Sequence, residues 1–377
     1  MKKHYQLKIP SRINILGNPA DANEGDFAII SSAINIFAHA IIEPANQIHL
    51  SLYNSLNSND LIHEENFPLG FINTNYGDDL ALMKAAIKVL YEFSPEFKQK
   101  YNSSGFSMRF WTEVPRQSGL GGSSLFVLLL LGGMREFYEL DPNIHNDYIL
   151  SEIAQHAEAD ELGIACGFAD RIVPLFGGIC YTDYRGKVLP HSIGEEPMTT
   201  YERLDEWVDE LPLVIASTGV QRDSGDVHGQ MRPRYIEAWK KYLQTGGNYP
   251  PMVQFMANTY ETAWRGKMAL LRHDWKMFGD LMNQNHSFVN DMMNFCGFTD
   301  GAGWANNLMI HAALDNGALG AKLTGAGSGG SVFALTYPGE EYKLINVWEE
   351  TAEANGLTNA VIRKVEIARK GLRIEEI

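Results

Sequence analysis

The residues best suited to chemistry lie in a glycine-rich segment from Pro115 to Ser124, with the sequence Pro-Arg-Gln-Ser-Gly-Leu-Gly-Gly-Ser-Ser. The apolar stretch 123–138 predicts a helix that begins where the glycine-rich segment ends. Glycines let the backbone approach a ligand closely, and a helix start directs free N–H groups and partial positive charge at an anion. The serine hydroxyls could bind phosphate or Mg²⁺. This is more than an N-capped loop requires, and a Walker A loop is excluded because no Gly-Lys-Ser/Thr follows.

Two carboxylates follow this segment. Glu158 falls on a predicted amphipathic helix over 148–162, and Asp170 lies twelve positions later, beyond breaks at Gly163 and Gly167. Phosphoryl transfer needs one carboxylate to hold a metal ion and a second to orient a hydroxyl group. Taken alone, such a pair is more typical of a solvated glutamate on a helix and an aspartate that caps the next helix.

A second glycine-rich segment, 322–331, reads Lys-Leu-Thr-Gly-Ala-Gly-Ser-Gly-Gly-Ser. It matches the dinucleotide-binding pattern Gly-x-Gly-x-x-Gly, which should open a helix. Here the following residues, 331–337, have the pattern of a strand, so a Rossmann domain is rejected. The segment is therefore a predicted strand–turn–strand hairpin. Its backbone N–H groups could line an anion site, or it could be a plain loop.

Strands and helices in mixed order must position these segments. Up to the polar stretch 191–206, the patterns predict strands over 5–15, 27–43, 47–53 and 106–114, and helices over 78–93, 123–138 and 148–162. After it they predict strands over 211–217, 320–324, 331–336 and 360–365, and helices over 227–243, 252–271, 275–285, 304–316 and 340–354. The absence of strict βαβ alternation indicates α+β domains, with boundaries at 1–195 and 205–377.

Composition narrows the class of protein. Of 377 residues, 46 are acidic and 31 are Lys or Arg, and the net charge of −15 disfavours a general nucleic-acid partner. The three cysteines form no Cys-x-x-Cys pair, which favours a reducing compartment over a disulfide framework. The longest apolar run, 125–134, is too short to span a membrane, and the N-terminus lacks a signal-peptide pattern. We expect a cytoplasmic monomer or homodimer with a small-molecule partner and no membrane partner.

Three segments together resemble the galactokinase–homoserine kinase–mevalonate kinase–phosphomevalonate kinase (GHMP) superfamily. The stretch 11–21, Ser-Arg-Ile-Asn-Ile-Leu-Gly-Asn-Pro-Ala-Asp, resembles the first family motif. The segment 115–124 resembles the second motif, and 324–331 resembles the third. The resemblance implies an N-terminal α/β domain like the second domain of ribosomal protein S5, a ferredoxin-like C-terminal α+β domain, and an active site in the cleft between them.

The resemblance also implies roles for individual residues, with ATP and Mg²⁺ as cofactors. Asp170 would orient or deprotonate the acceptor hydroxyl, and Arg12 would lie beside it and stabilise charge on the transferring phosphoryl group. Ser123 and Glu158 would hold Mg²⁺, because the family keeps its metal-binding Glu and catalytic Asp at this separation. The residues expected to bind ATP are Pro115, Gly119, Leu120, Gly121, Gly122, Ser123, Ser124, Gly325 and Gly327.

The substrate is indicated by departures from the galactokinase motif Gly-Glu-His-x-Asp, which here reads Gly-Asn-Pro-Ala-Asp at 17–21. This stretch, the Asp-Arg pair at 170–171 and Asp-Ser-Gly-Asp-Val-His at 223–228 resemble the glucuronokinases, which phosphorylate the anomeric hydroxyl of glucuronic acid. Ser-Thr-Gly-Val at 217–220 also resembles bacterial heptose kinases. The residues expected to bind substrate are Asn18, Asp21, Arg171, Arg222 and Asp223.

The two arginines of this set leave alternatives open. Arg171 and Arg222 could pair bidentately with a sugar carboxylate, or Arg171 could only support Asp170 while Arg222 is solvated. The sequence thus predicts an ATP-dependent kinase for the 1-hydroxyl of a uronic acid, with a heptose or another neutral sugar as the alternative. A non-catalytic sugar sensor, a decarboxylating mevalonate-type enzyme and a Mg²⁺ phosphohydrolase are the competing classes.

Overall fold

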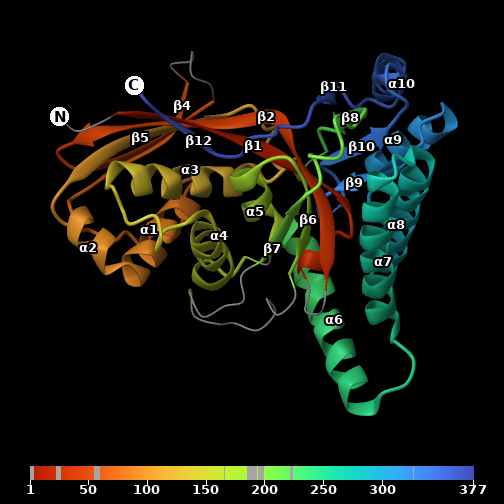
Figure 1. Ribbon diagram of the computed structural model, residues 1–377, viewed down its shortest axis with the longest axis horizontal. Helices are drawn as coiled ribbons and strands as arrows, with labels where there is room; N and C mark the ends of the chain where they lie inside the picture. The colour runs from red at the N-terminus through yellow and green to blue at the C-terminus, as the bar shows by residue number, and fades with distance from the viewer. Residues whose placement is uncertain are drawn as a thin grey trace.

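The computed structural model describes residues 4–22, 27–54, 60–164, 166–184, 193, 199–220, 224–325 and 327–377. It has two lobes, each built around its own β-sheet, and the strands β1 (Tyr5–Leu16) and β2 (Ala28–Ala45) run from the first lobe toward the second (Figure 1). At that end β1 and β2 pack against helix α7 (Pro251–Leu271) of the second lobe. The predicted α+β class is therefore confirmed.

The first sheet lies above a layer of helices. Its strand order is β12 (Arg373–Glu376), β1, β2, β5 (Gly105–Thr112), β3 (Ile48–Tyr53) and β4 (Leu61–Phe67), with β6 (Ile179–Asp183) on β2 and β7 (Thr200–Arg203) on β6. The helices are α1 (Ala81–Phe93), α2 (Pro95–Tyr101), α3 (Gly122–Phe137), α4 (Asp147–His156) and α5 (Ala169–Phe176). α3 is buried along most of its length because it is apolar on nearly all sides.

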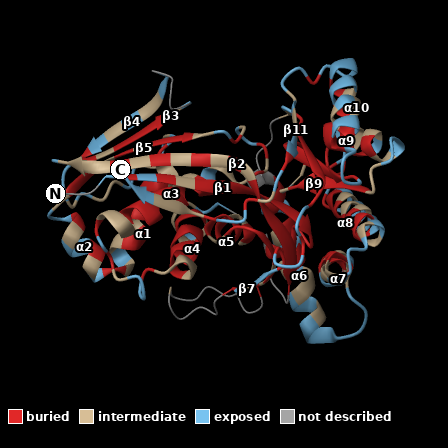
Figure 2. Cartoon of the chain, turned by 45° about the horizontal axis from the view of Figure 1, so that its top comes forward, coloured by how far each residue is buried: buried red, intermediate tan, exposed pale blue. Residues whose placement is uncertain are grey.

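The second sheet has the order β11 (Val361–Val365), β8 (Leu213–Ser217), β10 (Ser331–Leu335) and β9 (Gly320–Thr324), and its neighbouring strands pair antiparallel. The residues of β8, β9 and β10 are all buried, and they include Lys322 in the middle of β9. The helices of this lobe are α6 (Ser224–Thr245), α7, α8 (Trp275–Phe295), α9 (Trp304–Asp315) and α10 (Glu341–Ala354). Figure 2 shows that the outer ends of α6 and α10 are exposed.

Several elements differ from the sequence prediction. The helix expected over 148–162 is α4 followed by a π-helical turn, η2 (Ala157–Glu161), and α8 runs ten residues past its expected end at Asn285. Asn285 does not end the helix because its side chain bonds to another segment instead of its own backbone: it accepts from Gly17 N (2.9 Å) and donates to Asn18 O (3.2 Å). The elements β4, α2, α5, β6, β7 and β12 were not predicted.

The C-terminal strand β12 bears on the predicted domain boundaries. It pairs antiparallel with β1, and Ile377 N donates to His4 O at 2.9 Å, so both chain ends lie in the first lobe (Figure 1). A division into 1–195 and 205–377 therefore separates β12 from the sheet to which it belongs. Of the expected connection, 191–206, residues 191, 192 and 194–198 lie outside the described residues. Within the described residues, none of the helices combines the length and apolar character needed to cross a bilayer.

Candidate active site

The two glycine-rich turns line a cavity of about 680 Å³. It is lined by residues of β1, the 115–124 turn, η2, α5, α6 and the 324–330 turn. The turns touch at Gly119 and Gly325, both with positive φ (+73° and +77°). A Cβ atom on Gly119 would lie 2.9 Å from Thr324 O, so this contact requires glycine.

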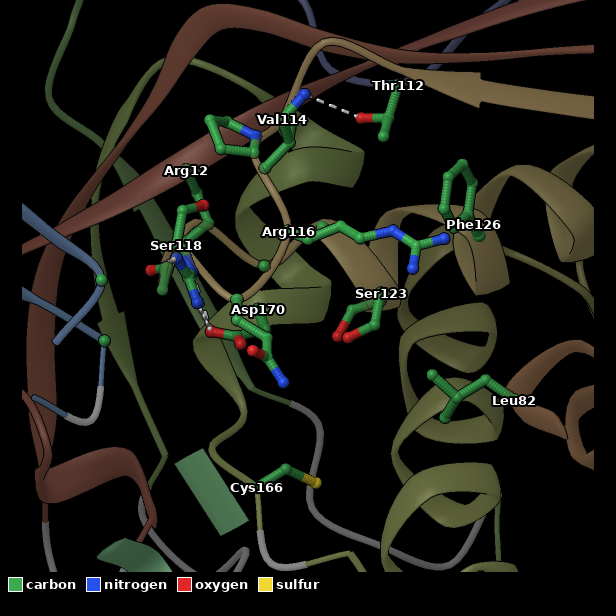
Figure 3. Close-up of a pocket in the computed structure, with 18 of the residues that line it drawn as sticks. Arg12, Leu82, Thr112, Val114, Arg116, Ser118, Ser123, Phe126, Cys166 and Asp170 are labelled. Atoms are coloured by element: carbon green, nitrogen blue, oxygen red, sulfur yellow. Dashed lines mark hydrogen bonds and ion pairs between the residues drawn. The ribbon is translucent and has the colours of Figure 1, made fainter. Parts of the chain in front are cut away.

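The first turn presents the start of α3 to the cavity. Gly121 caps the helix in the left-handed conformation (φ +77°), and the first N–H groups of α3 have no partner within the helix. Ser123 is exposed and faces the cavity, and Arg116 extends above it toward Phe126 (Figure 3). A helix start with free N–H groups and nearby arginine is a site for an anion such as phosphate.

Arg12 and Asp170 meet at the edge of this turn, although 158 positions separate them in the chain. Arg12 Nε donates to Asp170 Oδ1 at 2.8 Å, its Nη2 contacts the same oxygen, and its Nη1 donates to Gly119 O at 2.7 Å (Figure 3). Burial raises the pKa of Asp170, but the charges of Arg12 and Arg171 outweigh it and hold the pKa below its usual value. Asp170 is therefore ionised at neutral pH and is a weak base.

Asp21 is a second carboxylate that lines the cavity and lies within reach of the charge of Asp170. Its Oδ2 accepts from Ala169 N (3.1 Å), the first residue of α5. Burial and the nearby charge of Asp170 raise the pKa of Asp21 to about 6. A Cβ atom at Gly167 would collide with this carboxylate, so glycine is needed there.

Asn18 links the first motif to the third. It lines the cavity but is 1% exposed, because Lys322 Nζ donates to its Oδ1 at 2.6 Å and its Nδ2 donates to Gly325 O at 3.4 Å. Lys322 also donates to Asn14 O (3.2 Å), and burial lowers its pKa to about 7. Asn18 thus holds two loops together with its amide group.

Glu158, on η2, lines the cavity and is fixed from two sides. Ser124 Oγ donates to its Oε1 at 2.8 Å, and Arg171 forms an ion pair with its Oε2. Arg171 also donates to Gly167 O and is 1% exposed. The expectation that Arg171 pairs with a substrate carboxylate is therefore corrected, because Arg171 is not among the residues that line the cavity and its guanidinium pairs with Glu158.

The remaining expected site residues have different positions. Pro115, Gly122 and Gly327 line the cavity, whereas Leu120 is buried and its carbonyl accepts from Ser11 Oγ at 2.8 Å. Arg222 and Asp223 lie outside the described residues. Three further features of the cavity were not among the expected site residues: His228, which was noted only as part of the motif at 223–228, Cys166 and an apolar end. The apolar end is formed by Leu52, Ile62, Leu82, Met83 and Phe126. Such residues carry no local signal, because strands and helices of any core have the same pattern.

Comparison with known families agrees with this geometry. The family described as the GHMP kinases N terminal domain matches residues 81–178, and that described as GHMP kinases C terminal matches residues 268–354. The first match contains the turn, Glu158 and Asp170, and the second contains the hairpin turn with Gly325. The chain belongs to the GHMP kinase superfamily.

Similar proteins include other GHMP kinases of comparable length. A probable glucuronokinase 2 of Arabidopsis thaliana is 28% identical over 92% of this chain and 87% of its own, and glucuronokinase 1 of the same plant is 28% identical over 97% and 93%. The crystal structure of Lactococcus lactis galactokinase with galactose has the same fold, with a TM-score of 0.73 and 18% identity, covering 99% of this chain and 95% of that one. The two-domain GHMP kinase fold is thus confirmed.

Proposed function

We propose that this GHMP kinase transfers the γ-phosphoryl group of ATP to the anomeric hydroxyl of a sugar, preferably a uronic acid such as glucuronate. The observation that carries the proposal is the contact of Arg12 with both Asp170 and Gly119 O. One buried cation thereby joins a carboxylate that could hold an acceptor hydroxyl to the turn that would hold the phosphates. Phosphoryl transfer depends on such positioning and charge neutralisation.

ATP would lie along the length of the cavity. The free N–H groups at the start of α3 and the glycine turn at 325–330 suit its phosphate chain. Its adenine ring would occupy the apolar end beside Leu82 and Phe126, on the far side of Ser123 from Asp170 (Figure 3). This orientation directs the γ-phosphoryl group toward Arg12.

The donor set near the phosphate turn suits Mg²⁺. Ser123 offers a hydroxyl and Glu158 a carboxylate, and Mg²⁺ commonly takes one or two protein oxygens together with substrate phosphates. The contacts of Ser124 and Arg171 fix the orientation of the Glu158 carboxylate, as the outer partners of metal ligands do. Bound there, Mg²⁺ would neutralise negative charge on the phosphate chain.

Asp170 would accept a hydrogen bond from the acceptor hydroxyl and align its oxygen with the γ-phosphorus. Because its pKa is lowered, Asp170 would not remove the proton beforehand but would take it as the new oxygen–phosphorus bond forms. Arg12 would stabilise the charge on the transferring group. These roles follow from the contacts of Arg12 described above.

Two observations support the preference for a uronic acid: the two similar plant proteins are glucuronokinases by name, and the motif at 223–228 resembles that of glucuronokinases. With Arg171 paired to Glu158, Arg222 is the arginine we assign to the sugar carboxylate. A buried carboxylate is unfavourable unless it is paired, so a site with such an arginine should reject a neutral sugar. The stretch 217–220 favours a heptose or another neutral sugar as the second candidate.

The test is a comparison of kcat/KM for glucuronate, galacturonate, glucose, galactose and a heptose with ATP, with the phosphate position of the product read by ³¹P NMR. A uronic acid should exceed its neutral analogue, and Arg222→Ala should narrow that gap by about tenfold to a hundredfold. A neutral sugar that reacts best would overturn the uronic-acid assignment and leave the kinase standing. ATP binding without turnover of any sugar would favour a sensor.

A further inference from the structure

His228 is a cavity residue to which the mechanism above assigns no role. It lies near the start of α6 and lines the same cavity as Asp21 and Asp170. The residue is 8% exposed, and its ring nitrogen Nδ1 is buried with no hydrogen-bond partner among the residues that the structure describes. Buried polar atoms in folded proteins are nearly always paired, so an unpaired nitrogen at a cavity wall indicates a partner supplied by a ligand.

The charge state of His228 restricts the kind of ligand group that it can bind. Burial lowers the pKa of His228 to about 4; Asp170 raises it, while Arg232 and Arg171 lower it further. The imidazole is therefore neutral at pH 7, with one N–H donor and one acceptor nitrogen. A neutral ring suits a hydroxyl group, which both donates and accepts, better than a carboxylate, which only accepts and carries a charge that the neutral ring does not balance.

The position of His228 selects the acceptor over ATP. The cavity residues whose charge acts on it include Asp170, the carboxylate we assign to the acceptor hydroxyl. The adenine and the phosphate chain are assigned to the apolar end and to the two glycine turns. We propose that His228 binds a hydroxyl group of the acceptor sugar and so discriminates among sugars that differ at that hydroxyl. This inference rests on the proposed sugar kinase function and deepens it.

Loss of a hydroxyl-binding His228 should change the kinetics in a different way from loss of Arg222. Loss of Arg222 should change the ratio of kcat/KM between a uronic acid and its neutral analogue. Loss of His228 should leave that ratio unchanged, because both sugars carry the hydroxyl. It should instead change the ratio between the parent sugar and the one deoxy analogue that lacks the bound hydroxyl. The two residues can therefore be told apart with one set of sugars.

The experiment uses the full-length enzyme, the best acceptor and its series of monodeoxy analogues. Wild type should discriminate against one analogue by about tenfold or more, the effect of one lost hydrogen bond to a buried group. His228→Leu should lower kcat/KM for the parent by a similar factor, leave that analogue nearly unaffected, and so abolish the discrimination. His228→Gln, which keeps a donor and an acceptor, should retain part of it.

Controls separate this role from a structural one. His286 is half-buried, and burial lowers its pKa to about 4 as it does for His228, but His286 does not line the cavity, so His286→Leu should leave the discrimination unchanged. The affinity for ATP and the melting temperature report whether each variant folds. An equal loss of kcat/KM for all analogues in both His228 variants would overturn the inference alone. Absence of turnover with every sugar by wild type would overturn the proposed function and this inference with it.

Discussion

Asp170 has a pKa below its usual value because the charges of Arg12 and Arg171 outweigh the effect of burial, which by itself would raise the pKa. Replacing it with Asn keeps its shape but removes its charge and its capacity to take a proton. We expect Asp170→Asn to lower kcat at least about a hundredfold while ATP affinity changes little. Steady-state kinetics and calorimetric ATP titration would measure the two quantities. A variant that keeps more than about a tenth of wild-type kcat would remove Asp170 from this role.

The pKa of Asp21 is shifted in the opposite direction, and this shift makes the stability of the protein depend on pH. Its pKa in the folded state is about 6, above the ordinary value of 3.8, so the folded protein binds this proton more tightly than the unfolded chain. The free energy of unfolding should therefore fall as pH rises from about 4 to 6, by up to about 3 kcal/mol, and stay lower above pH 6.

Asp21→Asn cannot ionise, and its side-chain oxygen can still accept from Ala169 N. We expect this variant to be more stable than wild type at pH 8 and to lose that advantage toward pH 4. Urea titrations at several pH values would measure the difference. A stability gain of equal size at pH 4.5 and pH 8 would contradict the assigned titration.

At the scale of elements, the contact of the two glycine turns joins the lobes at the site that we propose for the phosphates. We expect Gly119→Ala to push the turns apart, because its Cβ would lie 2.9 Å from Thr324 O, and to weaken ATP binding at least about tenfold. Calorimetry with ATP would measure the loss. Gly246→Ala is the matched control, since Gly246 has a similar φ (+63°) but open space around its Cβ position. Equal ATP affinity in both variants would show that the contact is unimportant.

The elements that carry or flank the site residues differ in how readily the sequence predicts them. The helix α3 and the strands β9 and β10 have strong local patterns and were predicted within one or two residues. The π-helical turn η2 was not, although it carries Glu158, because an extra residue in a helical turn leaves no composition signal. α5 was also missed, since it has only eight residues and includes Pro174.

For the whole molecule, the C-terminal strand closes the first sheet after the chain has built the second lobe. Removing residues 373–377 would leave the edge of β1 without a paired strand. It would also remove the Ile374 side chain, which lies against α3 next to Gly132. We expect the truncated chain to melt at least about 3 °C lower than wild type. Differential scanning calorimetry would measure the shift. Glu375→Ala, an exposed change that keeps the strand, should leave Tm unchanged, and an unaltered Tm on truncation would contradict the structural role of β12.

The sequence by itself determined the chemistry of the segments: which turns are glycine-rich, which helix follows them, and that Glu158 and Asp170 stand at the separation used by GHMP kinases. The turns and the helix are local features that residue type and periodicity suffice to identify, whereas Glu158 and Asp170 were singled out through the resemblance to the family motifs. The tertiary structure decided which side chains face the cavity. Arg171 pairs with Glu158, Lys322 donates to Asn18, and His228 lines the same cavity as Asp170. Those orientations arise from contacts between residues far apart in the chain, where burial of charge and pairing of polar atoms, not local pattern, select the partner.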